Sequence, residues 1–571
     1  MAVPFVRQLG AEAGVQLNPL RDNSEIPSQD NSDQIFGIVM RATRGRIDKA
    51  FVVDSSNVYT KLGPGEPIRK NSLNEAWVHV VEALSNGAYQ AVVSRLVTDE
   101  AKIKWAVVKA ASTEAVVGSA KVGASTVAEE QGGSAQQGGF VFEVSDEVPE
   151  GEFLFAVKHL ECFNDGIKIE FHAEEKRSGG ENVANDEVTL RILDQTDEKT
   201  LYEFTGSLDI DAKDDYGNSY YLPDIVASQT DAVEVMVGVS GDKAKIAADS
   251  PAYGYAENGT QQWSQSDVLV CFTEGATEYE TADYLAARER LQYTQYDFAY
   301  VSAGGTRAVP LLMQLAQLAY ETNKQLRFDV PGELTPDAAV EWVEQLNFGA
   351  QKAAHLLHAF WAPFKSDDPT GVNPKGYFGT ATLNIALACG RNATRNAKGF
   401  AAKNYPIAGR EWQVTRSGIT QTHVPTSKEL NTLAKAKINP VIYETYTGGS
   451  RCVFLDSLTC AQVDQSLRKL IAVADMSTDI DDRVTRAAKD FLQLPMDVSV
   501  KRMRDYLTDL FTGAQASGWL VASNDPAMNG AAWRFVVQPN EARPYDAMDV
   551  SYWLRYDGTN RQTFVTQTIT K

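Results

Sequence analysis

Side chains that could perform chemistry are sparse along this chain of 571 residues. The best candidate for a phosphate site is Gly304-Gly305-Thr306, because it follows an expected strand and precedes an expected helix, whose first amides attract anions. No lysine or acidic metal ligand accompanies these glycines, so a plain strand-to-helix turn is the favoured interpretation. The sequence contains no phosphate loop, dinucleotide fingerprint, nucleophile elbow, zinc-protease motif or Cys-x-x-Cys pair.

Two polar groups could bind a metal ion. His355 and His358 would share one face of a helix, but no acidic or cysteine third ligand lies beside them, and packing histidines are favoured. Four aspartates near Gly217 resemble a calcium loop, although their spacing does not fit an EF-hand and a solvated β-turn is favoured: Asp209, Asp211, Asp214 and Asp215. We therefore expect no enzyme activity, no cofactor and no bound metal.

The composition predicts a large, acidic protein with several domains. Hydrophobic residues make up 43% and charged residues 23%, and the length predicts three or four domains or subdomains. The net charge of −21 argues against wrapping nucleic acid, which requires dense lysine and arginine. No signal peptide or membrane-spanning apolar run is visible, so we expect no membrane partner. Five scattered cysteines are expected to be buried, reduced thiols: Cys162, Cys271, Cys389, Cys452 and Cys460.

The elements that would position any site are clearest between residues 428 and 460. Apolar residues at three- and four-residue spacing predict a helix up to Ile438. Asn439-Pro440 should end it, because the residue before a proline avoids helical angles. Residues 441–446 and 452–455 are expected to form a hairpin around the turn Thr447-Gly448-Gly449-Ser450. This helix, stop and hairpin unit contains no catalytic spacing.

Two blocks, one before and one after the middle of the chain, predict an α/β core. In residues 34–97 we expect strands at 35–40, 50–53 and 88–97 and a helix at 73–84. Residues 279–389 alternate between expected helices at 279–292, 309–320, 335–346 and 377–389 and strands at 298–303, 326–330 and 355–360. Such an order predicts a parallel layer of strands covered by helices.

The region between the blocks, residues 102–278, has a different pattern. Short alternating runs broken by glycine, aspartate and asparagine predict an antiparallel β-sandwich or barrel. Because the first block needs partner strands that arrive only after residue 290, we interpret this region as an insertion. The predicted fold class is therefore multidomain, α+β or α/β, with a core made of N-terminal and C-terminal parts and an inserted β domain.

The two ends of the chain are expected to differ from the core. Residues 1–33 have little helical period and many loop formers, which predicts an extended arm. After residue 460 we expect helices at 461–474, 482–492 and 498–512 and strands at 513–521, 533–538, 548–556 and 562–570. The last run has strong β propensity and no turn to fold it back, so its edge would be available to another chain.

Several motifs together resemble the contractile tail sheath proteins of myovirus-type bacteriophages. The unit at 428–460, with its Gly-Gly-Ser turn and the following Leu455-Asp456-Ser457-Leu458-Thr459, is similar to the core of that family. The other similar segments are Gly37-Ile38-Val39, Arg44-Gly45, Phe51-Val52-Val53, Ser85-Asn86-Gly87, Phe328-Asp329-Val330-Pro331 and Pro374-Lys375-Gly376-Tyr377-Phe378-Gly379. The resemblance covers residues 34–97 and 298–571. It departs from the family pattern at 94–97 and 398–406.

This resemblance implies a mechanical, non-enzymatic role. Subunits of that family stack as six-fold rings around a tail tube and contract to drive the tube through the host envelope. The implied partners are other copies of the chain, the tail tube protein, the baseplate and tail terminator or neck proteins. The implied location is the virion tail, after synthesis in the host cytoplasm. The implied division is an arm at 1–33, core parts at 34–101, 279–425 and 426–560, an outer domain at 102–278 and an exchange strand at 561–571.

The resemblance also implies two kinds of functional residue. Strand exchange between subunits would use Val15, Leu17 and Leu20 of the N-terminal arm and Gln562, Thr563, Phe564, Val565, Thr566, Gln567, Thr568 and Ile569 of the C-terminal strand. The densest basic cluster at a helix start in the C-terminal region, Lys501, Arg502 and Arg504, is the candidate for contact with the tube. A bacteriocin or secretion-machine sheath remains an alternative, as does an α/β enzyme with a β-sandwich appendage.

Overall fold

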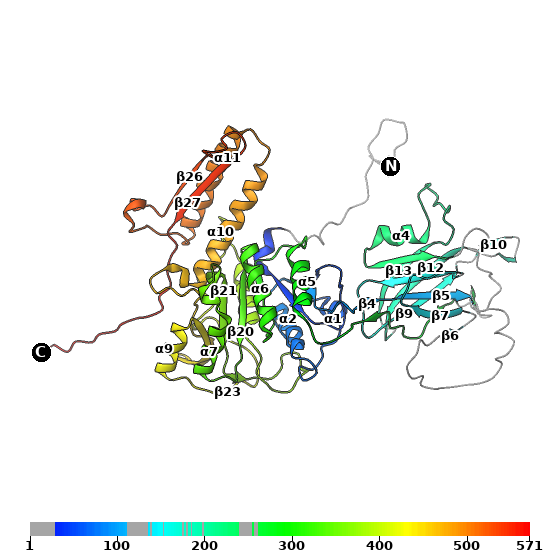
Figure 1. Cartoon of the computed structure of the whole chain (residues 1–571), viewed down its shortest axis with the longest axis horizontal. Helices are drawn as coiled ribbons and strands as arrows, with labels where there is room; N and C mark the ends of the chain where they lie inside the picture. Colours follow the sequence, from blue (N-terminus) through cyan, green and yellow to red (C-terminus); the bar gives the residue numbers. More distant parts are fainter. Residues whose placement is uncertain are drawn as a thin grey trace, which may run out of the picture.

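The protein has a mixed α/β architecture with several sheets, seen in a computed structural model (Figure 1). It describes residues 29–570 except 111–134, 138–139, 152, 174–175, 179–180, 184–185, 197–198, 239–253 and 256–260. A central α/β body lies between a β-rich body and a C-terminal module, and the last residues extend away from the molecule. Among the described residues, no helix is both long and apolar enough to cross a membrane.

The central body is built on an eight-stranded sheet with the order β2-β3-β1-β19-β20-β21-β24-β25. The six inner strands pair in parallel, and the outer strands β2 and β25 are antiparallel to their neighbours. Phe36 is paired with Tyr300, so the sheet joins residues 35–95 directly to residues 300–454. The strands are β1 (Ile35–Met40), β2 (Phe51–Val53), β3 (Gln90–Arg95), β19 (Tyr300–Ser302), β20 (Gln325–Val330), β21 (Leu357–Trp361), β24 (Ile438–Tyr446) and β25 (Gly449–Phe454).

Side chains that alternate along the inner strands supply one apolar cluster on each face of this sheet. In β1, Phe36 and Ile38 belong to one cluster and Ile35 and Val39 to the other. The first cluster is covered by α2 (Glu75–Ser85) and α8 (Ala381–Asn392). The second is covered by α5 (Thr281–Gln292), α6 (Val309–Thr322), α7 (Pro336–Leu346) and α9 (Ser427–Lys435). The predicted parallel, helix-covered layer is therefore confirmed.

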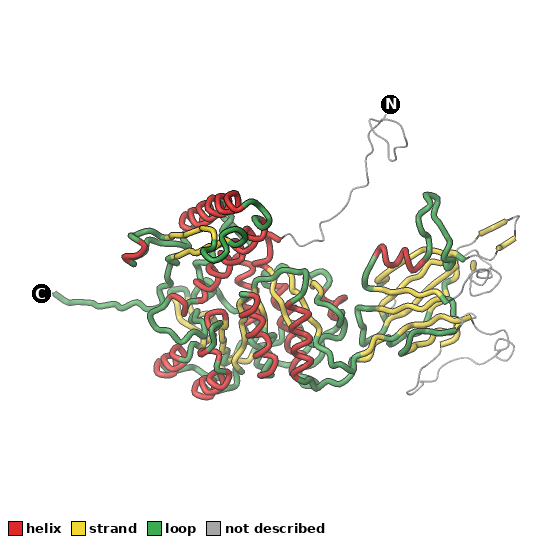
Figure 2. The backbone as a smooth tube through the Cα atoms, turned by 45° about the horizontal axis from the view of Figure 1, so that its top comes forward, coloured by secondary structure: helices red, strands yellow, loops and turns green. Residues whose placement is uncertain are grey.

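The β-rich body consists mainly of two antiparallel sheets (Figure 2). One has the order β13-β12-β9-β17 and the other β14-β8-β5-β7-β6. Phe140 and Phe155 of the second sheet and Phe171 of the first belong to one apolar cluster. The main strands are β5 (Trp105–Ala110), β7 (Phe140–Ser145), β8 (Phe155–His159), β9 (Ile167–Ala173), β12 (Glu187–Asp194), β13 (Thr200–Ser207) and β14 (Val233–Val237), accompanied by α4 (Leu222–Gln229), and shorter strands are β6 (Ala135–Gln137) and β17 (Ser264–Gln265). The short pair β4 (Lys102–Ile103) and β18 (Phe272–Thr273) connects this body to the core.

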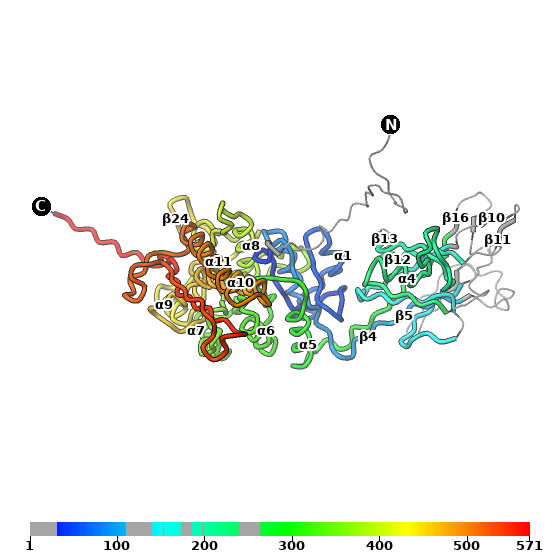
Figure 3. The backbone as a smooth tube through the Cα atoms, turned by 90° about the horizontal axis from the view of Figure 1, so that it is seen from above, coloured from blue at the N-terminus to red at the C-terminus, as the bar shows by residue number. Residues whose placement is uncertain are grey.

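The C-terminal module contains α10 (Ile471–Asp490), α11 (Met496–Ala516) and a two-stranded sheet of β26 (Trp533–Pro539) and β27 (Met548–Leu554). Met503, Leu507 and Leu510 of α11 lie in its apolar cluster, as predicted, with Tyr506 packed against it. The module projects from one side of the central body in Figure 1 and overlies it when seen from above in Figure 3.

Four predicted elements in the C-terminal half are wrong. The helix of the 428–460 unit ends at Lys435, and Asn439-Pro440 lies inside β24, where the Asn439 amide donates to the carbonyls of Ala359 and Leu458. The tertiary contacts of Asn439 thus outweigh the local stop signal.

The predicted helices at 461–474 and 482–492 are replaced by one helix, α10, that begins at Ile471. Residues before it are held in an extended path by the bridge between Leu458 and Leu470. The predicted strand at 513–521 is instead the end of α11 followed by a turn. The run at 562–570, predicted to pair with another chain, forms no strand with the described residues of its own chain, and its pairing elsewhere stays a prediction.

Candidate functional site

The C-terminal tail, residues 557–570, is the most exposed apolar segment of the molecule that the structure describes. Phe564, Val565 and Ile569 are 90%, 87% and 91% exposed. At its start the Asp557 amide donates to the Trp519 carbonyl at 2.9 Å. Its anchor further along the tail is Arg561, which donates through Nε to Asp456 at 2.8 Å and also through Nη2. All eight predicted exchange residues, 562–569, therefore lie beyond this anchor as extended chain. Their pairing with another subunit stays a prediction.

The two-stranded sheet of the C-terminal module is covered by a helix on one face but has free strand edges among the described residues. A lone pair of strands is marginal in water and is stabilised by a third strand or by a covering helix. Here α11 packs on one face through Phe511, whose ring contacts Phe535 and Tyr552. Within the described ranges no third strand joins β26 or β27. The module therefore offers strand edges to a further strand.

The three predicted tube-facing residues separate into two kinds. Lys501, Arg502 and Arg504 lie in the second and third turns of α11, not at its first residue, Met496. Arg504 donates to the carbonyl of Val537 at 2.7 Å and thereby holds β26. Lys501 and Arg502 are exposed and have no recorded polar contact among the described residues. Only the latter two side chains are available for a partner.

The predicted exchange residues Val15, Leu17 and Leu20 lie outside the described residues. The nearest described element is the 3-10 helix η1 (Gln29–Gln34). Asp33 in this helix is almost fully buried, and its carboxylate contacts Arg395 at 2.7 Å and Lys403 at 3.1 Å. The chain that precedes the sheet is thus tied to the core at Asp33.

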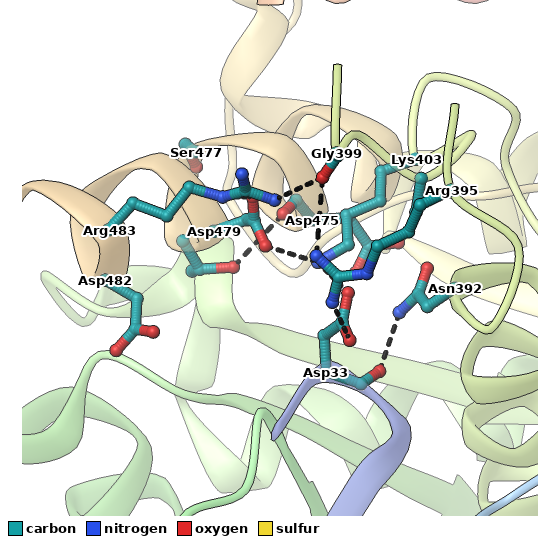
Figure 4. Close-up of polar contacts among 12 residues, drawn as sticks. Asp33, Asn392, Arg395, Gly399, Lys403, Asp475, Ser477, Asp479, Asp482 and Arg483 are labelled. Atoms are coloured by element: carbon teal, nitrogen blue, oxygen red, sulfur yellow. Dashed lines mark hydrogen bonds and ion pairs between the residues drawn. The ribbon is translucent and has the colours of Figure 1, made fainter. Parts of the chain in front are cut away.

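A buried charge cluster surrounds that contact (Figure 4). Lys403 lies between two carboxylates, with Asp33 on one side and Asp479 of α10 at 2.8 Å on the other. Burial by itself would lower the pKa of Lys403, but Asp479 and Asp33 outweigh it and hold the pKa above its ordinary value. The cation therefore persists in the interior and bridges the N-terminal segment and the C-terminal helix.

A second carboxylate of α10 enters the core one turn earlier. Asp475 contacts Arg391 of α8 at 2.9 Å and Arg327 of β20 at 3.3 Å. Burial would raise the pKa of Asp475, yet the charges of Arg391 and Arg327 lower it below its ordinary value. Helix α10 is therefore docked by buried ion pairs at positions i and i+4, and both carboxylates are ionised.

The loop at 395–405 connects this cluster to the C-terminal module. The Phe400 and Trp519 rings contact each other edge to face at 4.9 Å, and Trp519 Nε1 donates to the carbonyl of Ala401 at 2.9 Å. Arg483 of α10 donates to the carbonyl of Gly399 at 3.1 Å. We call residues 395–405 the hub loop. It coincides with the stretch where the sequence departs from the sheath pattern.

The candidates for chemistry are accounted for by packing. A Cβ on Gly305 would lie 2.6 Å from the carboxylate of Glu75, so this turn faces a negative charge and is unsuited to phosphate.

The two metal candidates are also explained by packing and turns. His355 lies in a 3-10 turn and His358 in β21, where its Nε2 contacts the His355 carbonyl, so the predicted shared helical face is wrong. Asp214 accepts from Tyr216 and Asn218 in an exposed turn. In the described ranges no three histidine, cysteine or acidic side chains are placed to hold a metal.

Sequence reasoning missed the charge cluster. One signal was present, since Asp475, Asp479 and Asp482 recur at i, i+4 and i+7 among apolar residues, and an acidic stripe on an apolar helix face predicts cationic partners. Their partners could not have been found, because the paired residues are far apart along the chain: 76 positions for Lys403 and Asp479, 84 for Arg391 and Asp475, and 148 for Arg327 and Asp475.

Comparisons with known proteins gave matches among solved structures alone. No family model and no curated protein matches the chain. Among solved structures, it is similar to a chain of the anti-feeding prophage baseplate, six-fold symmetrised, with 11% identity and a TM-score of 0.38 over 53% of this chain and 78% of that one. It is also similar to a chain of the PVC sheath complex, an extracellular contractile injection system in its contracted state, with 15% identity and a TM-score of 0.39 over 50% of this chain and 74% of that one.

Proposed function

We propose that this protein is the structural subunit of a contractile tail sheath of a bacteriophage. Subunits would polymerise as stacked six-fold rings around a tail tube and contract to drive the tube through the host cell envelope for genome ejection. The observation that carries the proposal is the exposed, β-prone tail at 561–570 on a molecule whose own C-terminal sheet has only two strands. The motif resemblance at 34–97 and 298–571 supports it independently.

Strand exchange suits a machine whose subunits rotate past one another. A tail of ten residues spans about 33 Å when extended, which is enough to cross from one subunit to the next. Backbone hydrogen bonds of an added strand supply affinity, while the chain between tail and body bends freely. We propose that the C-terminal tail of one copy adds to the sheet edge of β26 or β27 in another, together with Val15, Leu17 and Leu20 of the N-terminal arm.

The energy for contraction would be stored at assembly. An extended, strained sheath released by the baseplate would relax to a shorter and better-packed helix, so nucleotide hydrolysis is unnecessary. Other implied partners are the tail tube protein and the tail terminator or neck proteins. The region at 102–278, with its two antiparallel sheets, would form an outward β-sandwich domain. No nucleic-acid or membrane contact enters this proposal, and the location would be the virion tail.

Lys501 and Arg502 are the proposed contacts to the tube. Both are exposed on α11, and the reversed charge of Lys501→Glu with Arg502→Glu should abolish tube attachment without unfolding the module. Lys428→Glu is the matched control, since Lys428 is exposed on α9 of the central body. Normal co-sedimentation of the double variant with tubes would rule out this contact.

Two alternatives remain distinguishable. A sheath of a phage-derived bacteriocin or secretion machine would share every feature above, and capsid genes beside its gene would favour the phage. An α/β enzyme would require a ligand at the carboxyl ends of the parallel strands. That position is lined by Glu75 and Asp329 around a cavity of only about 20 Å³, too small for a substrate.

The deciding experiment is electron microscopy of the purified full chain at raised concentration. Hollow striated tubes are expected from the full chain and none from a variant ending at residue 560. A second variant keeps the length but replaces three exposed tail residues, Phe564→Ser, Val565→Ser and Ile569→Ser, and it should also fail to form tubes. Tyr545→Ser, at a position 94% exposed on a loop, is the control that should assemble normally. Monomers from the full chain under all conditions would contradict the proposal.

A further inference from the structure

Asp33 is the last charged group before the sheet begins, and it is held from three sides. Its carboxylate contacts Arg395 and Lys403 of the hub loop, and its backbone carbonyl accepts from the Asn392 amide at 2.8 Å. The side chain of Asp33 is only 5% exposed. The last residue of the predicted N-terminal arm, Asp33, is therefore fixed in the interior of the core.

Asp479 is the corresponding group on the C-terminal side. One of its oxygens accepts from Lys403, and the other accepts from Arg483 Nε at 2.8 Å. Helix α10 is part of the C-terminal module and also contacts its sheet. Asp481, two residues after Asp479, accepts a hydrogen bond from the Tyr552 hydroxyl of β27. The position of Asp479 thus sets how the module and its tail are directed.

Lys403 is the single cation shared by these two carboxylates. It is 3% exposed, so neither water nor another side chain can replace a lost partner without rearrangement. If α10 moves and Asp479 leaves Lys403, the lysine keeps only the charge of Asp33, and the strength of the Lys403–Asp33 ion pair changes. If Asp33 leaves Lys403, the Lys403–Asp479 ion pair changes in the same way. No direct contact between Asp33 and Asp479 is recorded among the described residues.

We propose that the Asp33–Lys403–Asp479 bridge couples the two ends of the subunit, so that η1 and α10 dock or release as one unit. The functional meaning rests on the proposed sheath function, in which both ends are exchanged with neighbours. A force on the N-terminal exchanged segment would then be transmitted to the C-terminal one, or the reverse, through the buried Asp33–Lys403–Asp479 bridge. Contraction would spread between subunits through this coupling, since buried ion pairs have discrete docked and undocked states.

The test is hydrogen exchange of the purified full chain, read at two separate places. Asp33→Asn should accelerate exchange of the α10 amides after residue 479, although no hydrogen bond or ion pair joins Asp33 to the described residues of α10, by about fivefold or more, the lower end of typical site-to-site coupling. Asp479→Asn should accelerate residues 29–36 by a similar factor, because coupling free energies are reciprocal. Lys403→Met should accelerate both.

Asp482→Asn is the matched control. Asp482 lies on the same helix and pairs with Arg486 at 2.7 Å, without contact to Lys403. It should loosen α10 locally and leave residues 29–36 unchanged. If Asp33→Asn fails to fold, Asp33→Glu, which keeps the charge but displaces it, should show a smaller change in the same direction.

Unchanged α10 exchange in a folded Asp33 variant would overturn the proposal, as would acceleration of residues 29–36 by Asp482→Asn. The measurement is made on the unassembled chain, so it is independent of tube formation. Reciprocal coupling without tubes would leave the bridge established and reject only the sheath function. Tubes formed by a chain whose variants show no coupled exchange would support the sheath function and reject the bridge proposal.

Discussion

The two junctions that attach outer parts to the central body are built on different principles. At the C-terminal junction, ion pairs are buried, with the side chains of Asp475 and Lys403 1% and 3% exposed, and the adjoining cavity measures about 30 Å³. At the junction to the β-rich body, Arg46 pairs with Asp231, whose side chain is 70% exposed, beside a cavity of about 600 Å³. Arg44 pairs with Asp165 at the same junction.

The difference predicts different mechanical behaviour. A buried cluster of charges tolerates no partial opening, because each uncompensated ion in the interior is costly. A junction with a partly exposed pair loses less when that pair opens, since solvent reaches the charges again. The C-terminal module should therefore move only by all-or-none release, whereas the β-rich body can shift by small amounts.

The largest expected effect comes from removing the shared cation. Lys403→Met removes the buried cation that Asp33 and Asp479 share and leaves them only Arg395 and Arg483, so it should lower the free energy of unfolding by about 3–5 kcal/mol. Urea denaturation followed by tryptophan fluorescence would measure it. Lys398→Met, an exposed lysine in the same hub loop, should change stability by less than about 0.5 kcal/mol. Equal effects of the two substitutions would show that the buried bridge does not stabilise this junction.

Acid should weaken the C-terminal junction selectively. Burial opposes ionisation of Asp479, but Lys403 and Arg483 lower its pKa below the ordinary value of 3.8. The stabilisation is therefore complete above pH 3.8 and is lost as pH falls through the depressed pKa, at about 1.4 kcal/mol for each pKa unit of depression. Unfolding of Asp479→Asn between pH 5 and pH 2 should show a shallower loss than the parent chain. Parallel curves would contradict this assignment.

His79 in the central body should show the opposite pH dependence, because its stabilising contribution is lost as pH rises and not as pH falls. Burial favours neutral His79, but the carboxylates of Glu75 and Asp329 raise its pKa above 6.5. Its contribution is full below pH 6.5 and is lost as pH rises through the raised pKa. His79→Gln should remove this alkaline loss of stability, measured as melting temperature between pH 6 and pH 9. A decline that persists in the variant would assign it to other groups.

The junction to the β-rich body should respond less than the C-terminal one. Asp165→Asn breaks the bidentate pair with Arg44 and should cost about 1–2 kcal/mol, because both side chains are about a tenth exposed and the substituted amide can still accept a hydrogen bond. Limited proteolysis of the connecting segment near residues 102 and 272 would detect the loosening. Asp146→Asn, whose pair with Lys104 is more exposed, is the control. A loss as large as that of Lys403→Met would erase the contrast between junctions.

The smallest effect is expected at the tail. Arg561→Ala removes the contact to Asp456 at a site that is about one fifth exposed, and should change the stability of the unassembled chain by about 1 kcal/mol or less. Its consequence should appear in assembly, because the contact sets where the tail leaves the body. Tubes with unchanged yield and geometry would show that this anchor is dispensable.

Much of the local structure followed from patterns in the sequence. The helix that begins after Thr335 was predictable, because a capping threonine and an early proline are strong local signals. The strand predicted at 326–330 was predictable from the alternation of Leu326, Phe328 and Val330 with polar residues. The hairpin of β24 and β25 was predictable from its glycine turn. The start of α10 was not, because the segment before it is held extended by a bridge to Leu458 that local propensity does not report.

Sequence alone therefore determined the period of most elements, the acidic composition and the β propensity of the tail, because these depend on neighbouring residues. Tertiary structure decided that Asn439 lies in a strand, that 562–570 forms no strand with the described residues of its own chain and that Lys403 joins Asp33 to Asp479. Those outcomes depend on groups brought together from distant positions. A buried charge is tolerated only where an opposite charge lies beside it, and the residues next to it in the sequence do not predict which distant charge that will be.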